Sequence, residues 1–326
     1  MVNKNLKKVI EGWGNISSEI SVKERSGLPG TAGGTTNQTP SIDHEEIILF
    51  CNILTATKIR DSLSKKVKLN GALLESGIRD VKKDPKEDKE YSKQFIYSHS
   101  NASYGILEYL LNNEKNAKTI RDSLVQHTKF EGVLIGESLV NPAILLHSNS
   151  TYAILEYLCG NVSTARSIRN ELIGKIGISR SGLMGLSVKD PAVNSYANST
   201  FGVLEFLLGN TNHSNKIYSS LIREIGCFGG LVKWDKNEIE DNKMVFKGYA
   251  QANAFFGTLN YLVGDLANSK TIMKGIKEKI GFSEDLINYC IGNNSISTSA
   301  NSAMGIFCLA YKLKKCAMAP DGQFKL

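Results

Sequence analysis

Hydrophobic positions along this chain repeat in units of two predicted helices. In the segment that begins at Asn101, apolar residues share one face at helical spacing, namely Ile106, Leu107, Leu110 and Leu111. About four residues later a second segment follows, the spacing of a tight helical hairpin. Its apolar residues stand one turn apart, and the later units repeat them: Ile120/Leu124, Ile168/Leu172, Ile217/Leu221 and Ile272/Ile276. The pattern predicts a repeated helical hairpin.

One asparagine stands at the start of each predicted first helix and gives the period of the repeat. These anchor asparagines are Asn101, Asn149, Asn198, Asn253 and Asn301, at steps of 48, 49, 55 and 48 residues. A period of this length indicates an array of similar units. A divergent copy begins near Asp43, because its KIRDSL segment at 58–63 nearly repeats TIRDSL at 119–124. Asp43 therefore marks a sixth first helix.

The connections between units predict how the array closes. About twenty residues lead from a second helix to the next first helix, and loops of that length carry function or short strands. The last copy ends near Leu313 without a second helix, which residues 4–13 have the pattern to supply. We expect an all-α fold, an (α/α)6 toroid of six helical-hairpin repeats of about 50 residues. It forms a single domain over residues 1–326, with 14–40 a flexible N-terminal loop; an open solenoid is the alternative.

A family resemblance rests on the repeat itself. The pattern Y-x-x-x-N-A-x-x-G-x-L-x-Y-L-x-G-D at Tyr249–Asp265 resembles the repeat of six-hairpin glycosidase-like proteins. The resemblance implies a toroid that acts on carbohydrates. CFGGLVKW at Cys227–Trp234 is faintly similar to a loop of isoprenoid-type toroid enzymes. The acidic clusters and zinc ligands of that class are absent from the sequence, which disfavours it.

In a closed ring, the long connections gather at one mouth beside the N-terminal ends of the first helices. Helix N-termini offer spare N–H donors there, and aromatic faces with amide groups are what carbohydrate recognition requires. We therefore assign substrate binding to the polar and aromatic residues of this mouth: Tyr97, Asn101, Asn149, Tyr196, Asn198, Tyr249, Gln251 and Asn253. For the asparagines, N-capping of the first helices is the first expectation, and ligand contact is the second.

Four residues are the catalytic candidates: Asp43, Glu45, His99 and His147. Glycoside hydrolysis needs two carboxyl groups roughly 5–10 Å apart, and Asp43 with Glu45 belongs to the densest acidic group of the mouth. His99 and His147 occupy equivalent positions, where they would act as general bases or metal ligands. A favourable interaction with the helix dipole is the alternative for the acids, and hydrogen bonding to neighbouring turns for the histidines.

Other carboxyl groups give weaker signals. None of the remaining mouth acids forms a diagnostic pair: Glu131, Glu137, Asp190, Asp235, Glu284 and Asp285. Glu108, Glu156 and Glu205 recur in three successive units. A catalytic residue has no reason to recur, so we expect these three to form structural hydrogen bonds or ion pairs. An acid/base pair in the lumen is the alternative.

Composition narrows the choice of partners. The 326 residues carry a net charge of +7, but the basic residues are scattered, so we expect no nucleic acid partner. The six cysteines lack zinc-ligand spacing, and we expect no metal and no cofactor. The sequence shows no apolar secretion signal or membrane-spanning stretch, so we expect a cytoplasmic protein with no membrane partner. The oligomeric state stays open.

These observations favour a carbohydrate-active enzyme, similar to a glycoside hydrolase or a sugar epimerase, that acts on a small-molecule ligand at the mouth. The alternative is a noncatalytic helical-repeat protein that binds a partner or serves as a scaffold. Whether turnover occurs is left open at this point.

Overall fold

The computed structural model describes residues 44–77, 95–235 and 246–318, all of which belong to the unit His44–Leu326. For residues 44–51 only the helix itself is described. Residues 4–13, 14–40 and Asp43 lie outside the described residues, so the expectations for them stay predictions.

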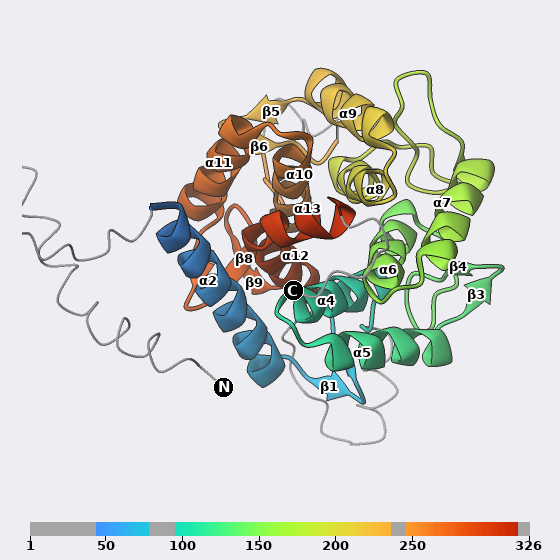
Figure 1. Ribbon diagram of the computed structural model, residues 1–326, viewed down its shortest axis with the longest axis horizontal. Helices are drawn as coiled ribbons and strands as arrows, with labels where there is room; N and C mark the ends of the chain where they lie inside the picture. Colours follow the sequence, from blue (N-terminus) through green and yellow to red (C-terminus); the bar gives the residue numbers. More distant parts are fainter. Residues whose placement is uncertain (1–43, 78–94, 236–245, 319–326) are drawn as a thin grey trace, which may run out of the picture. The chain divides into compact units, whose positions relative to one another are not determined.

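Five inner helices form a closed ring in the described part of the chain (Figure 1). Each packs against the next, and the last packs directly against the first. In ring order they are α4 (Ser98–Leu110), α6 (Leu146–Leu158), α8 (Ser195–Leu207), α10 (Ala250–Val263) and α12 (Thr298–Cys308). Nearly every residue of these helices is buried, which means that the lumen is packed with side chains below its mouth.

The outer layer places one helix against each inner helix. The outer helices are α2 (His44–Lys66), α5 (Glu114–His127), α7 (Val162–Ile176), α9 (Thr211–Ser220) and α11 (Leu266–Gly275). The last two continue into the π-helical turns η2 (Leu221–Ile225) and η3 (Ile276–Ile280). The apolar pairs of the second helices, such as Ile168/Leu172, are fully buried between the layers. This confirms the predicted all-α toroid of helical hairpins.

The first hairpin differs from the expectation. The helix at Asp43 was expected in the inner layer, with residues 4–13 covering the last inner helix. Instead α2 is one continuous outer helix that packs on α12. No Gly-Asn or Gly-Asp turn interrupts its sequence, and its KIRDSL segment is a copy of an outer helix. The described ring therefore has five inner helices, where we expected six.

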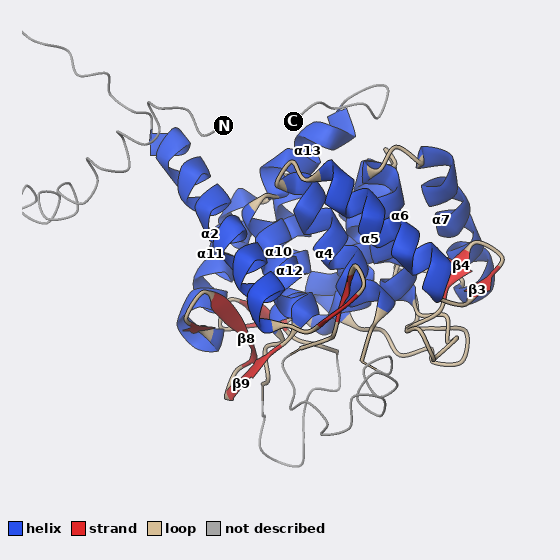
Figure 2. Cartoon of the chain, turned by 90° about the horizontal axis from the view of Figure 1, so that it is seen from below, coloured by secondary structure: helices blue, strands red, loops and turns tan. Residues whose placement is uncertain are grey.

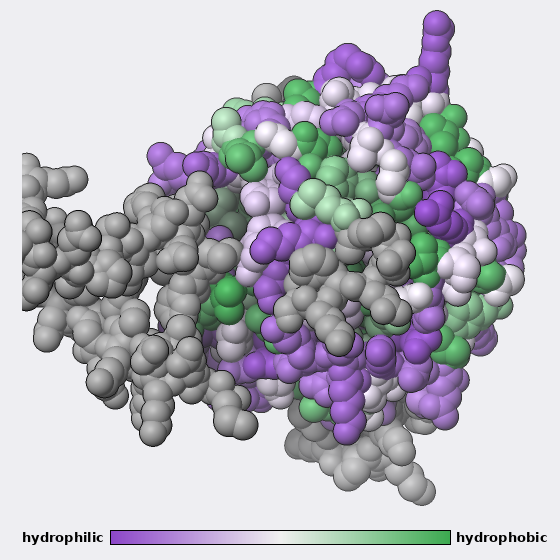
Figure 3. Space-filling model, viewed as in Figure 1, coloured by the Kyte–Doolittle hydropathy of each residue, from purple (hydrophilic) through white to green (hydrophobic). Residues whose placement is uncertain are grey.

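Opposite ends of the ring are closed differently. Short antiparallel strands occupy the long connections at one end, as the loop lengths predicted (Figure 2). They are β1 (Leu69–Asn70) with β2 (Leu73–Leu74), β3 (Phe130–Glu131) with β4 (Leu134–Ile135), β5 (Cys227–Phe228) with β6 (Leu231–Val232), and the three-stranded β7 (Phe282–Ser283), β8 (Leu286–Cys290) and β9 (Asn293–Ile296). Helix α13 (Ala310–Met318) lies at the other end, where Lys312 Nζ donates to Leu110 O at 2.7 Å. The surface of this second end mixes hydrophilic and hydrophobic residues (Figure 3).

Each anchor asparagine fastens the preceding connection to its inner helix. Asn198 accepts from the Met184 N–H at 2.8 Å and donates to the Met184 carbonyl at 3.0 Å and to the Asn194 carbonyl at 3.1 Å. The other four anchors make the same three contacts and are likewise fully buried. The N-cap role expected for them is wrong, because the anchors lie inside the first helical turn. The residues at the N-cap positions are Tyr97, Leu145, Asn194, Tyr249 and Ser297.

Small residues let neighbouring inner helices approach closely. A Cβ atom on Gly305 would lie 2.7 Å from Leu107, and one on Gly257 would lie 2.3 Å from the Phe307 ring. Gly105 meets Leu155 and Gly202 meets Leu259 in the same way. In each case the glycine lies four residues after the anchor asparagine of its helix. It leaves room for the apolar side chain that lies six residues after the anchor of the neighbouring inner helix. The contact between Gly305 and Leu107 joins α12 to α4 and so closes the ring.

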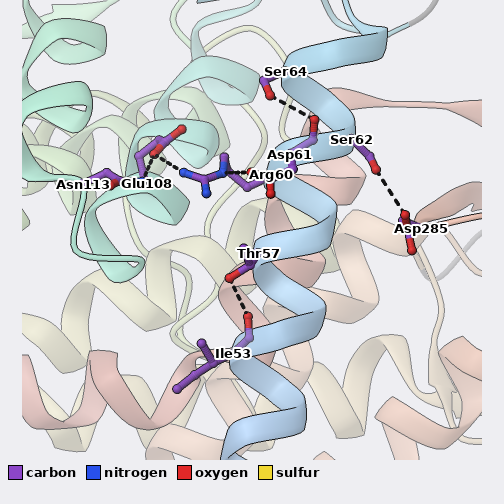
Figure 4. A network of polar contacts seen from close by, with 9 residues as sticks. All are labelled: Ile53, Thr57, Arg60, Asp61, Ser62, Ser64, Glu108, Asn113 and Asp285. Carbon is purple, nitrogen blue, oxygen red and sulfur yellow. Dashed lines mark hydrogen bonds and ion pairs between the residues drawn. The ribbon is translucent and has the colours of Figure 1, made fainter. Parts of the chain in front are cut away.

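Buried glutamates tie the inner helices to the outer layer. The Glu108 carboxylate lies 3.4 Å from Arg60 of α2 and accepts from Asn113 at 2.7 Å (Figure 4). Glu205 pairs with Arg169 at 2.6 Å, and the Glu156 carboxylate lies 3.7 Å from Arg121. The expected structural role of the three glutamates is confirmed.

Replacing Gly257 tests the close approach of the inner helices. We expect Gly257→Ala to lower the free energy of unfolding by about 1–3 kcal/mol, because the added methyl group overlaps the Phe307 ring. Gly174 of α7 has no atom within 4 Å of an added Cβ, so Gly174→Ala should raise stability by about 0.5–1 kcal/mol. Urea unfolding followed by circular dichroism measures both. Equal changes in the two variants would contradict the close approach.

The anchor role of Asn198 can be tested separately. Asn198→Ala leaves the buried Met184 N–H and carbonyl without partners, which should cost about 2–4 kcal/mol of unfolding free energy. The matched change is Asn212→Ala at an exposed position of α9, expected to stay within about 0.5 kcal/mol. Similar losses of unfolding free energy in both variants would show that the contact between Asn198 and Met184 does not stabilise the fold.

Candidate functional site

A cavity of about 480 Å³ opens at the hairpin end of the ring, where the first and last described repeats meet. Its floor comes from the inner helices, through His99, Ser100, Gln251 and Ser299, and its walls include Tyr97, Glu137 and Tyr289. Gly77 forms an antiparallel β-bridge with Ser297 where the first and last described repeats meet. A Cβ atom at Gly77 would lie 2.2 Å from the Ile296 carbonyl oxygen, so the approach of the two connections requires glycine there.

Five residues occupy the same position in the five inner helices, two residues before each anchor. We call them the mouth ring: His99, His147, Tyr196, Gln251 and Ser299. His147 is in contact with both of its neighbours, since the ring centroids of His99 and His147 lie 4.8 Å apart and those of His147 and Tyr196 lie 5.1 Å apart. The mouth ring therefore collects side chains that the sequence separates by 48–55 residues.

An aromatic row continues from the mouth ring along the wall. Tyr196 stacks on Trp234 at a centroid distance of 6.2 Å, and Trp234 meets Tyr249 at 4.9 Å. Tyr249 in turn meets Tyr289 at 5.4 Å, which returns the row to the cavity. The mouth thus offers aromatic faces beside hydrogen-bonding groups.

Burial keeps the two histidines uncharged. It lowers the pKa of His99 to about 4 and holds the pKa of His147 well below its ordinary value, with the neighbouring His99 adding to the effect. The buried Nδ1 atom of each ring has no hydrogen-bond partner among the described residues. Both imidazoles therefore stand in the neutral form.

Glu137 is the acidic side chain that lines the cavity. Burial raises its pKa, and its Oε2 accepts from Asn141 Nδ2 at 2.5 Å. Burial and the nearby Glu137 also raise the pKa of Tyr97. The other described mouth acids lie elsewhere: Glu131 pairs with Lys175 at 2.6 Å, Glu284 pairs with Lys66, and Asp190 accepts from Ala192 N–H within its own turn.

The predicted site residues divide into three groups. Tyr97, His99 and Gln251 line the cavity, while His147, Tyr196 and Tyr249 lie beside it in the aromatic contacts. The anchor asparagines use their side-chain amides on the backbone, which removes the reason to assign them to substrate binding. Glu45 belongs to the outer helix α2, and its side chain, like Asp43, lies outside the described residues.

Sequence reasoning missed several lining residues. Ser299 holds the mouth-ring position of its repeat, so the alignment of anchors was a signal for it. Glu137 stood among the mouth acids, but nothing in the sequence separated it from the others. Tyr289 lies on the part of β8 that pairs with β9, and the other described connections have no such third strand.

Clusters of three metal-ligating side chains and helices able to span a membrane are both absent from the described residues. Across residues 44–77, 95–235 and 246–318, no three His, Cys, Asp or Glu side chains come together as ligands of one metal ion. None of the helices in those ranges has the length and apolar character of a membrane span.

Known proteins resemble this chain in fold. No family model matches the sequence, and no curated protein does. A glycosidase variant of known structure is 9% identical, with 83% of this chain and 99% of that chain covered and a TM-score of 0.51. The GH76A alpha-1,6-mannanase from Salegentibacter sp. HEL1_6 is 13% identical, with 81% and 99% covered and a TM-score of 0.48. Cellobiose 2-epimerase from Bacillus thermoamylovorans B4167 is 11% identical, with 82% and 87% covered and a TM-score of 0.48.

At these identities the likeness is one of fold. The resemblance to six-hairpin glycosidase-like toroids that the repeat predicted is confirmed at that level. The chemistry of this chain has to be argued from its own cavity.

The buried histidines predict how stability depends on pH. The unfolded chain binds protons at the ordinary histidine pKa of about 6.5, whereas His99 in the folded protein does so only near pH 4. The free energy of unfolding should therefore fall as the pH is lowered from about 6.5 to about 4. His99→Gln should reduce that loss by on the order of 1–3 kcal/mol. Urea unfolding at several pH values measures it, and an unchanged slope in the variant would contradict the buried neutral imidazole.

Proposed function

We propose that the cavity at the mouth binds a carbohydrate and that the protein is a carbohydrate-active enzyme of the epimerase type. The observation that carries the proposal is the composition of the lining. Aromatic faces, an amide, hydroxyl groups, a neutral imidazole and one carboxyl group meet in a cavity of about 480 Å³. That volume falls within the range of small-molecule sites.

Each type of lining group suits one feature of a sugar. Tyr97 and Tyr289 supply aromatic faces for the CH face of a pyranose ring. Gln251 and Ser299 supply hydrogen-bonding groups for its hydroxyl edges. The side-chain amide of Gln251 is buried and its Oε1 atom has no hydrogen-bond partner among the described residues, so a polar group of a ligand would satisfy this amide.

The titratable groups favour proton transfer over two-carboxylate hydrolysis. Hydrolysis needs a pair of carboxyl groups about the scissile bond, and Glu137 alone supplies one among the described lining residues. His99 is neutral and lines the cavity, so it can take a proton from a sugar carbon beside a carbonyl group. Glu137 lines the same cavity with a pKa raised by burial, so it is the acid that can deliver a proton to the opposite face of the carbon; this inverts the configuration, which is epimerisation.

Solvent exchange tests this function directly. With the full chain in D2O, an epimerisable sugar should incorporate deuterium at the carbon that exchanges, followed by NMR. His99→Ala removes the base and should slow this exchange by about 10²–10⁴-fold, while sugar affinity changes only a few-fold. His127→Ala, at an exposed position of α5, is the matched change and should leave the exchange rate unaltered.

Two results would count against the proposal in different ways. Saturation-transfer NMR that detects no mono- or disaccharide at the protein would overturn carbohydrate binding altogether. Sugar binding without deuterium uptake in the unaltered protein would favour a noncatalytic binding protein. The packed lumen below the mouth is the structural feature that supports this second function.

A further inference from the structure

Within the part of the chain that the structure describes, the second residue of each inner helix has a backbone N–H group without a backbone acceptor at the mouth. The first N–H groups of α4, α6, α8 and α12 donate to carbonyl groups of the connections, for example Ser98 N–H to Glu137 O at 2.8 Å. No acceptor is recorded in the described residues for the second N–H, which belongs to the mouth ring. Orphan donors of this kind, together with the helix dipole, attract acceptor groups and anions.

Three of these helix ends open into the cavity. His99 of α4, Gln251 of α10 and Ser299 of α12 line it, and the three helices are neighbours in the ring. Because N–H groups at a helix start point out along its axis, the three donors are directed toward the hairpin end. The cavity floor is therefore a convergence of helix N-termini.

A buried side chain points to a ligand independently of the helix ends. Gln251 is 5% exposed and lines the cavity, and its Oε1 has no hydrogen-bond partner among the described residues. Buried amides are normally satisfied, and the two ends of a Gln amide can exchange places by rotation. The amide can thus present its NH2 group to an acceptor on a ligand.

Glu137 is the lining group that opposes an anion. Its Oε2 accepts a hydrogen bond from Asn141 of its own connection at 2.5 Å. Burial raises the pKa of Glu137, which favours the protonated carboxyl group. No lysine or arginine lines the cavity among the described residues, so backbone and amide donors hold the charge. Helix N-termini bind phosphate and carboxylate groups in this way.

We infer that the ligand of this cavity is an anionic carbohydrate, whose carboxylate or phosphate group binds at the N-termini of α4, α10 and α12. The inference rests on the proposed carbohydrate function and names the class of sugar. The Gln251 amide and the N–H groups at the start of these three helices are the donors available to the anionic group. The sugar ring then lies against Tyr97 and Tyr289.

Isothermal titration of the full chain tests the inference with four probes: glucuronate, glucose 6-phosphate, glucose and inorganic phosphate. We expect glucuronate or glucose 6-phosphate to bind at least about tenfold more tightly than glucose, and the stronger of the two identifies the anionic group. Glucose binding as tightly as both anions would overturn the inference and leave the proposed function standing. Failure of all three sugars to bind would overturn both, even if phosphate binds.

An isosteric charge change at Gln251 tests whether the anionic group binds at the helix ends. Gln251→Glu keeps the shape of the side chain and adds a negative charge, so the tighter-binding anion should lose at least about tenfold more affinity than glucose loses in the same variant. Gln126→Glu, at an exposed position of α5, makes the same change in net charge away from the cavity and should alter neither affinity. Equal losses in the two variants would show a nonspecific charge effect and overturn the assignment.

A variant at Ser299 keeps the inference testable if Gln251→Glu fails to fold. Ser299→Asp adds a charge at a helix start, where an acidic residue is favourable for the helix. It should weaken binding of the anion, whereas the neutral Ser299→Asn should weaken it less than about threefold. Retention of full anion affinity in both Gln251→Glu and Ser299→Asp would overturn the inference.

Discussion

Direct packing of α12 against α4 is the constraint on which the rest of the structure depends. The contact joins the last inner helix to the first, with Leu107 seated where Gly305 has no side chain. Because the ring closes there, the inner-helix N-termini all surround one opening. The first and last described connections then meet across it, and Gly77 pairs with Ser297 beside the cavity. An open array of the same hairpins would separate His99 from Ser299 and would have no cavity between them.

Repetition in this protein separates structural positions from positions available for chemistry. The anchor asparagine stays the same in all five described repeats, because its amide satisfies a buried N–H and a buried carbonyl of the connection. Buried Glu–Arg pairs recur in three repeats. In the fourth, Asn260 replaces the glutamate and Tyr218 donates to Asp265 in place of the arginine contact. The mouth ring differs at every repeat except for its two histidines, which is the variation expected where a ligand is recognised.

The closed ring also explains why neutral donors dominate the mouth. Helix starts and packed aromatic rings leave little water around His99 and His147, so the charged imidazolium is disfavoured. The same burial raises the pKa of Glu137 at the wall. In the proposed function, a site with this electrostatic character would accept and return protons through neutral groups, with oriented N–H dipoles stabilising negative charge. The fold and the proposed chemistry therefore share one cause, the convergence of the inner helices.

The sequence by itself determined the helical hairpin, its period and three of the residues that line the cavity. Helix pairs follow from apolar spacing at i and i+4, because that signal acts over one or two helical turns. The aligned anchors then place Tyr97, His99 and Gln251 at the start of inner helices. Only the tertiary structure decided that α2 covers α12, that five described inner helices close the ring, and that Glu137 and Tyr289 line the cavity. It also decided that the anchor asparagines hold hairpins, since each bonds a residue 14–27 positions earlier. These outcomes depend on which distant surfaces pack together, and a local pattern of polar and apolar residues does not encode that choice.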